Sequence, residues 1–113
     1  MKSLEKLQKK IGIEFKNKDL LKVALSHRSI LNEDKRFKES NERLEFLGDS
    51  ILSFIVAEYL YLNYPEIEEG DASNIRASLV SKDALAEVAR EITLGEYLFL
   101  SKGEERVGGR NNP

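Results

Sequence analysis

Three carboxylate side chains stand close together in one decapeptide, Asn41 to Ser50. Glu42, Glu45 and Asp49 are three and four residues apart, so a helix turning about 100° per residue places them on one narrow stripe. Like charges at these spacings repel and destabilise a helix by roughly 0.2–0.5 kcal/mol per pair. Carboxylate oxygens are ligands that Mg²⁺ prefers, and a bound cation would remove the repulsion. The stripe is therefore a candidate metal site, and a solvated acidic face is the alternative interpretation.

The decapeptide opens a long predicted helix that positions these acids. Ser40 is the expected cap, and the helix is expected to run to about Asn63, because Pro65 cannot continue it. Beyond Leu52 the pattern is apolar on every side, which is typical of a buried helix. We therefore expect the acids at the mouth of a core. Phe46 lies on the acidic side, where an aromatic ring needs a neighbouring segment or a second subunit to cover it.

The remaining apolar periodicity also favours helices. Helix-start residues precede each periodic stretch. We expect a first helix from Ser3 that stops at Gly12, and a second that starts at Asn17 or Asp19. After the long helix we expect one that starts at Asp71 or Ser73 and runs to Val80, and another that starts at Ser81 and ends before Gly95. Residues 32–39 are charged and predict an exposed loop. Only residues 97–100 have strand-like composition, and one such run forms no sheet. The expected fold class is all-α.

Composition is that of a single domain with a modest core: 113 residues, 41% hydrophobic and 34% charged. The absence of Cys excludes a disulfide framework and a thiolate metal site. The N-terminus, Met1 to Lys10, is charged and lacks the apolar stretch of a signal peptide, and no apolar run is long enough to span a membrane, so we expect a cytoplasmic protein without a membrane partner.

Charge is divided unevenly along the chain. The net charge is −2, yet residues 1–40 hold eleven Lys or Arg against six acids, which gives +5, while residues 41–113 hold seven against fourteen, which gives −7. Phosphate contacts supply most sequence-independent affinity for nucleic acid, so this chain alone is expected to retain RNA weakly.

The decapeptide closely resembles the signature of the ribonuclease III family, endonucleases that cut double-stranded RNA. The similarity covers nearly the whole chain, because further segments follow in the order that bacterial members show: Ser26-His27-Arg28-Ser29, Tyr64-Pro65, Glu69-Gly70-Asp71, Arg76-Ala77-Ser78-Leu79-Val80, Ala86-Glu87-Val88-Ala89-Arg90 and Gly108-Gly109-Arg110-Asn111.

This resemblance implies the multi-helix ribonuclease III endonuclease-domain fold and metal-dependent hydrolysis of double-stranded RNA, including precursors of rRNA and mRNA. The implied cofactor is Mg²⁺, with Mn²⁺ as a substitute. Glu45 and Asp49 resemble direct metal ligands, and Glu42 resembles a supporting catalytic acid. Glu69 and Phe46 resemble residues of the cleft and the dimer interface, where Phe46 would enter a pocket of the partner. The implied partners are double-stranded RNA and a second copy in a homodimer.

In the family, the glycine-rich stretch leads into a helix that carries a second acidic pair, which is absent from this chain. Asn112-Pro113 is a helix-opening pair at the point where the chain stops. We therefore expect residues 1–113 to be a partial ribonuclease III catalytic domain that lacks its last helices and a double-stranded-RNA-binding domain, with impaired activity. Two alternatives are a catalytically inert dimeric relative that binds RNA or serves as a scaffold, and a helical dimerisation module without a nucleic-acid role.

Other residues invite weaker interpretations. His27 is the only His and is expected to be structural or to cap a helix. Gly48 is expected to permit close helix approach. The glycine pair before Arg110 lacks a phosphate-loop pattern. The cations nearby are expected to be solvated more than RNA-bound: Lys102, Arg106 and Arg110.

Overall fold

The computed structural model describes residues 3–113. Its helices are α1 Leu4–Ile11, α2 Lys18–Ala24, α3 Ser29–Glu33, α4 Glu42–Asn63, α5 Glu69–Leu79, α6 Lys82–Glu91 and α7 Lys102–Arg106, with the 3-10 turns η1 Leu94–Tyr97 and η2 Gly109–Asn111. Within these residues no strand forms, and one isolated parallel bridge joins Ser26 to Phe99. The all-α prediction is confirmed.

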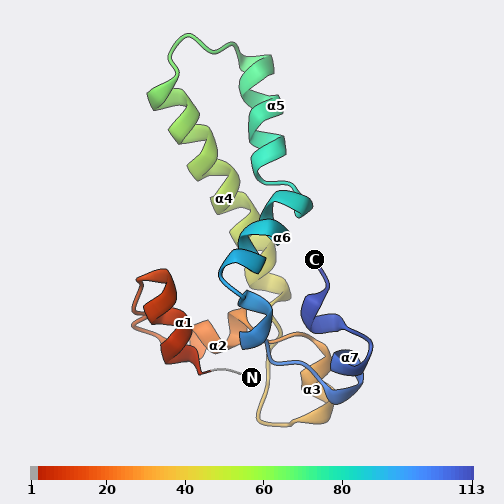
Figure 1. The fold of residues 1–113 in the computed structure, drawn as a ribbon. Coiled ribbons are helices and arrows are strands. Elements are labelled where there is room, and N and C mark those ends of the chain that lie inside the picture. Colours follow the sequence, from red (N-terminus) through yellow and green to blue (C-terminus); the bar gives the residue numbers. More distant parts are fainter. Residues whose placement is uncertain (1–2) are drawn as a thin grey trace.

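The molecule is a helical body with a projecting arm, and it extends 51 × 31 × 24 Å. Helices α4 and α5 form the arm as an antiparallel pair, and α6 leads the chain back to the body, where α1, α2, α3 and α7 lie (Figure 1). Among the helices described, none combines the length and the apolar character that crossing a membrane requires.

Several helix ends follow from local residues, as predicted. The Ser3 hydroxyl accepts a hydrogen bond from the Lys6 amide at 3.3 Å, and Gly12 ends α1 in the left-handed conformation (φ 72°). The Asn17 side chain caps α2, and the Ser81 hydroxyl caps α6 by accepting from the Ala84 amide at 3.2 Å. Short-range polar signals were sufficient here because the cap and its partner lie within three residues of each other.

The predictions for the start of α5 and for the loop before α4 were wrong. Helix α5 begins at Glu69, before Asp71 or Ser73, because the Ala72 amide already donates to the Glu68 carbonyl and Glu68 takes the N-cap position without a side-chain cap. The loop predicted at 32–39 begins at residue 34 rather than 32, since α3 continues to Glu33. The loop is also less free than predicted, because the Phe37 ring lies 5.1 Å from the Phe99 ring, centroid to centroid.

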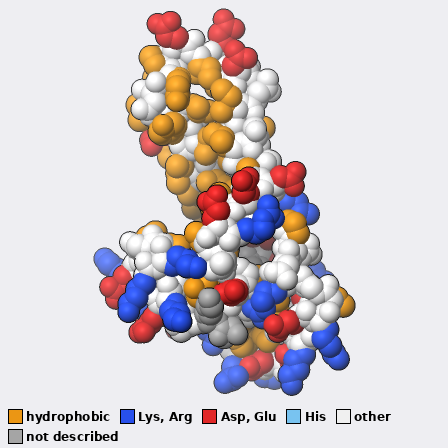
Figure 2. Space-filling view, in the orientation of Figure 1, with side chains coloured by type: hydrophobic (Ala, Val, Ile, Leu, Met, Phe, Trp, Pro, Cys, Tyr) orange, Lys and Arg blue, Asp and Glu red, His pale blue; other side chains and the backbone are white. Residues whose placement is uncertain are grey.

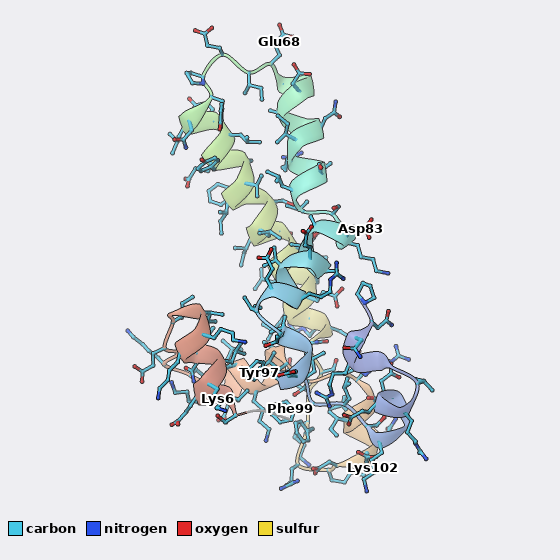
Figure 3. All side chains as sticks on the ribbon, in the orientation of Figure 1. Lys6, Glu68, Asp83, Tyr97, Phe99 and Lys102 are labelled. Atoms are coloured by element: carbon cyan, nitrogen blue, oxygen red, sulfur yellow. The ribbon has the colours of Figure 1, made fainter. Side chains whose placement is uncertain are left out.

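The core lies in the body. Leu7, Leu21, Leu25 and Tyr97 form one buried cluster, and Tyr97 is only 1% exposed. Partly buried apolar side chains from α1, η1 and the segment after it pack around this cluster. Figure 3 shows Tyr97 and Phe99 in the body, close to α1 and α2.

Helix α4 corrects the expectation of a buried helix, because Leu60 is its only buried residue in the structure described. The stripe through Leu52, Val56 and Leu60 is partly covered on the side of α5, with which α4 packs. The opposite face is open, and Figure 2 shows hydrophobic side chains gathered over the arm. The prediction of a buried helix was wrong because α5 covers only one side of α4. The apolar side chains on the open face are 48–66% exposed: Leu47, Ile51, Phe54, Ile55 and Leu62.

Candidate acidic site at the start of the long helix

The start of α4 is fastened to the body through its backbone. The Asn41 amide donates to the Ser26 carbonyl at 2.9 Å, and the Glu45 amide donates to the Asn41 carbonyl at 2.8 Å. Ser40 lies one residue before the N-cap, which is Asn41, so α4 begins slightly later than predicted. The Ser40 hydroxyl nevertheless accepts from the Glu42 amide at 3.3 Å and donates to Glu42 Oε1 at 3.0 Å. The first acid is therefore held at a defined place.

Glu45 and Asp49 lie one helical turn apart on α4, and both are exposed. Neither carboxylate forms a salt bridge with another residue of the described chain, so no protein cation neutralises them. Glu42 and Glu45 stand in the first turn, where the helix dipole favours negative charge. These two free carboxylates one turn apart are hard oxygen donors that face solvent.

The three acids do not converge into a metal cage. Within residues 3–113, no group of three or more Asp, Glu, His or Cys side chains is arranged so that it could hold a metal ion. The Glu42 carboxylate is bonded to Ser40 instead. Mg²⁺ binds through one or two carboxylates while it keeps several waters, so the donor chemistry of Glu45 and Asp49 fits this cation as a partial ligand set.

Glu69 lies far from these acids in the single chain. It begins α5, just past the end of α4, and the 22 residues of α4 span about 30 Å at 1.5 Å per residue. Figure 3 shows the neighbouring Glu68 at the tip of the arm. Glu69 lines a half-open cavity of about 730 Å³ between α4 and α5, together with Leu60, Tyr61, Tyr64 and Arg76.

Phe46 is 80% exposed, so of the two expected covers, a neighbouring segment or a second subunit, the described chain does not supply the first. It follows Glu45 directly, so a surface that covers Phe46 would also approach the acidic stripe. Gly48 behaves differently from the expectation. A Cβ atom at this position would meet no heavy atom within 4 Å, so the predicted close helix approach is absent from the single chain described.

His27 has a structural role, as expected. Its Nδ1 accepts from the Ser29 amide at 3.1 Å and lies 2.8 Å from the Ser29 hydroxyl, which accepts from the Ser101 amide at 3.0 Å. The ring thus accepts from the first amide of α3, and the Ser29 hydroxyl joins this helix to Ser101, the N-cap of α7. Helix α3 was missed because its N-cap residue is Arg28, which forms no side-chain cap and is not among the common capping residues.

Arg110 corrects the expectation of a solvated cation. Its Nη1 donates to the Gly95 and Leu98 carbonyls, both at 2.9 Å, and its Nε donates to Glu105 Oε1 at 3.1 Å. The guanidinium lowers the pKa of the Glu105 carboxyl by this hydrogen bond and by its charge. Gly108 forms the turn before it in the left-handed conformation (φ 83°), which glycine adopts without strain. No sequence signal linked Arg110 to partners 12 and 15 residues away.

Residues 17–113 match the family model described as Ribonuclease-III-like. The chain belongs to this ribonuclease III family. Its all-helical fold matches the crystal structure of the nuclease domain of ribonuclease III from Campylobacter jejuni, with a TM-score of 0.86 and 43% identity over 100% of this chain and 74% of the other. Another structure of that nuclease domain has a TM-score of 0.88 and 42% identity over 98% and 74% of the two chains, and it is described as having flexibility in a region involved in dimer formation.

Curated relatives agree with this assignment. The chain is 53% identical over 107 residues to Ribonuclease 3 of Aliivibrio fischeri and 53% identical over 105 residues to Ribonuclease 3 of Caldanaerobacter subterraneus. The matches cover 95% and 93% of this chain, but 45% and 46% of those proteins. The chain therefore spans less than half the length of these relatives.

Proposed function

We propose that the protein is an endoribonuclease that hydrolyses double-stranded RNA with the help of a divalent metal ion, and that precursors of rRNA and mRNA are among its substrates. The observation that carries this proposal is the pair of exposed, unneutralised carboxylates at Glu45 and Asp49, set in the decapeptide of a ribonuclease III family member. An inert scaffold gains nothing from like charges at this spacing.

Glu45 and Asp49 would hold Mg²⁺, or Mn²⁺ in its place. When bound, such an ion supplies an activated water and neutralises negative charge on the phosphate. The protein contributes orientation: the Asn41 amide on the Ser26 carbonyl fixes the first turn of α4, and the Ser40 hydroxyl holds Glu42 as a supporting acid beside it. A rigid mounting of this kind keeps the ligands near their productive geometry.

We infer a homodimer as the working assembly. Phe46 is a large ring at 80% exposure, and the cavity of about 730 Å³ between α4 and α5 is lined mostly by apolar and aromatic side chains, together with Glu69, Ser73 and Arg76. A ring of this kind is a typical anchor for an apolar pocket on a partner. The nuclease domain of ribonuclease III from Campylobacter jejuni is described as having a region involved in dimer formation, which supports an assembly of this type.

Cutting by the 113-residue chain alone is expected to be impaired. Within residues 3–113 no third acidic, His or Cys side chain joins Glu45 and Asp49, so the protein contributes few ligands. The division of the chain as a partial catalytic domain and its place in the cytoplasm stay predictions.

Asp49→Asn tests the proposal in a polypeptide of the relatives' full length, with a labelled RNA duplex and titrated Mg²⁺. Asn keeps the shape of the side chain but removes the charge that a cation needs, so we expect the cutting rate to fall on the order of a hundredfold or more. Glu87→Gln on α6 is the matched control, because it removes an exposed acid outside the site.

Three outcomes separate the candidate functions. Unchanged cutting by Asp49→Asn would refute the role of the acidic stripe. Duplex binding without cutting by the parent, in Mg²⁺ and in Mn²⁺, would favour the inert RNA-binding relative. A parent that neither binds nor cuts the duplex would favour the dimerisation module.

A further inference from the structure

Positive charge gathers in the body, next to the acidic start of α4. Residues 1–40 carry +5, whereas residues 41–93, which build the arm and α6, hold four Lys or Arg against eleven acids. In Figure 2 basic side chains are spread over the body, and the far end of the arm is acidic. A polyanion is therefore attracted to the body and repelled by the arm.

The loop between α3 and α4, residues 34–41, is the part of the body that leads directly into the acidic stripe. Asp34 and Phe37 close a turn at its start, in which the Phe37 amide donates to the Asp34 carbonyl at 3.1 Å. The Arg36 guanidinium bonds both Asp34 carboxylate oxygens, at 2.6–3.1 Å. At its far end the loop is fixed by the Asn41 amide on the Ser26 carbonyl. Both ends of this loop are thus fastened.

Phe37 anchors the middle of the loop. Its ring packs against Phe99, and the Lys22 ammonium lies 4.5 Å from the centroid of the Phe37 ring. Lys35 and Lys38 flank this anchor and are exposed, so both lysines stand on a backbone that is held in place. Side chains on a fixed backbone lose less conformational freedom on binding than side chains on a mobile loop.

Several other cations of the body have internal partners. Lys10 Nζ donates to the Thr93 hydroxyl at 2.6 Å, Lys18 Nζ donates to Gln8 Oε1 at 2.9 Å, and Arg110 is held by η1. In the described chain Lys35 and Lys38 have no such partner. They are also followed closely by Ser40, which bonds the first acid of α4.

We propose that Lys35 and Lys38 form a contact for the backbone phosphates of duplex RNA, beside the site at which the duplex would be cut. This inference rests on the proposed function for the kind of ligand. Lysines bind phosphates as point charges, independently of base sequence, so the contact holds the duplex near the acidic stripe without selecting a sequence. It also offsets the repulsion between the acids and the phosphates.

The test is the salt dependence of RNA binding by the 113-residue chain. A labelled blunt RNA duplex is titrated in EDTA at several KCl concentrations, so that hydrolysis does not interfere, and affinity is read from fluorescence anisotropy. Each lost phosphate contact lowers the slope of log affinity against log salt by about 1. We expect the Lys35→Ala/Lys38→Ala double variant to lower it by about 2, for two duplexes of unrelated sequence alike.

Lys9→Ala/Lys82→Ala is the matched control. It removes the same charge from exposed positions on α1 and α6 and should keep the parent slope. Equal losses in both double variants would overturn the proposal, and so would a parent that does not bind the duplex. A loop variant that changes the oligomeric state in gel filtration but leaves RNA affinity unchanged would also overturn it, because the loop would then serve a protein partner such as the acidic arm of a second copy.

Failure of this inference can be told from failure of the proposed function. If the full-length polypeptide cuts RNA in a way that depends on Asp49, but the loop variants bind RNA like the parent, the loop contact alone is refuted. If RNA binding depends on the loop, but the full-length polypeptide cuts no duplex in any metal, the endonuclease proposal is refuted and the loop contact stands.

Discussion

The substitution Gly95→Ala tests how the C-terminal segment is held on the body. Gly95 lies in η1, where the backbone of η2 approaches so closely that an added Cβ would overlap the carbonyl oxygen of Arg110. The contact is with backbone, so no side chain can swing away, and η2 must shift. The Arg110 side chain is 19% exposed and donates to the Gly95 and Leu98 carbonyls. A shift of η2 therefore also strains these two hydrogen bonds of Arg110.

The expected cost follows from these contacts. Hydrogen bonds to charged groups contribute about 1.5–3 kcal/mol each, and inserting a methyl group into a packed site costs about 1–3 kcal/mol. The two costs do not add, because the shift that relieves the overlap is the one that breaks the bonds. The Arg110 side chain is also partly open to water, so hydrogen bonds to water offset part of the lost free energy. We expect the free energy of unfolding to fall by about 2–3 kcal/mol.

Urea unfolding followed by circular dichroism measures this change. For an m value of about 2 kcal/mol/M, the midpoint should fall by roughly 1–1.5 M. Gly103→Ala in α7 is the control, because its Cβ would meet only the Ser101 hydroxyl, at 4.0 Å, and Ala favours a helix over Gly. Combining Gly95→Ala with Arg110→Met should cost little more than either change alone. A parent-like midpoint for Gly95→Ala, or full additivity in the double variant, would refute the reasoning.

Two further predictions concern Gly48 and the pair formed by Asp34 and Arg36. Gly48→Ala should raise the free energy of unfolding by about 0.5–1 kcal/mol in urea, because Gly48 lies inside α4 with open space around it; a loss of stability would mean that another surface packs there in solution. The hydrogen bonds from Arg36 lower the pKa of Asp34 from 3.8 to about 2, so this pair stabilises the fold above pH 4 and the contribution disappears as the pH falls toward 2. In Arg36→Gln the pKa of Asp34, measured by NMR titration of its carboxyl group, should rise toward 3.8. An unchanged pKa would contradict the role of Arg36 in lowering it.

Local features of this protein were readable from the sequence. The caps at Ser3, Asn17 and Ser81 lie within three residues of the amides that they bind, and Gly12 ends its helix by its own backbone freedom. The acidic stripe depends only on the pitch of one helix. The decapeptide around Asp49 indicated the ribonuclease III family, which the family model and the relatives then showed.

Tertiary structure decided what covers each element. The sequence predicted a buried α4, but burial requires a second surface, and α5 covers one side only. Likewise Phe99, more than 60 residues later, packs on Phe37 of the 34–41 loop, and Arg110 is partly buried because Gly95 in η1 and Leu98 just after it offer two carbonyls. Caps and helical stripes are set by neighbours in the chain, whereas burial and long-range hydrogen bonds depend on which distant segments meet. The acids could therefore be found from sequence alone, and their surroundings only from the fold.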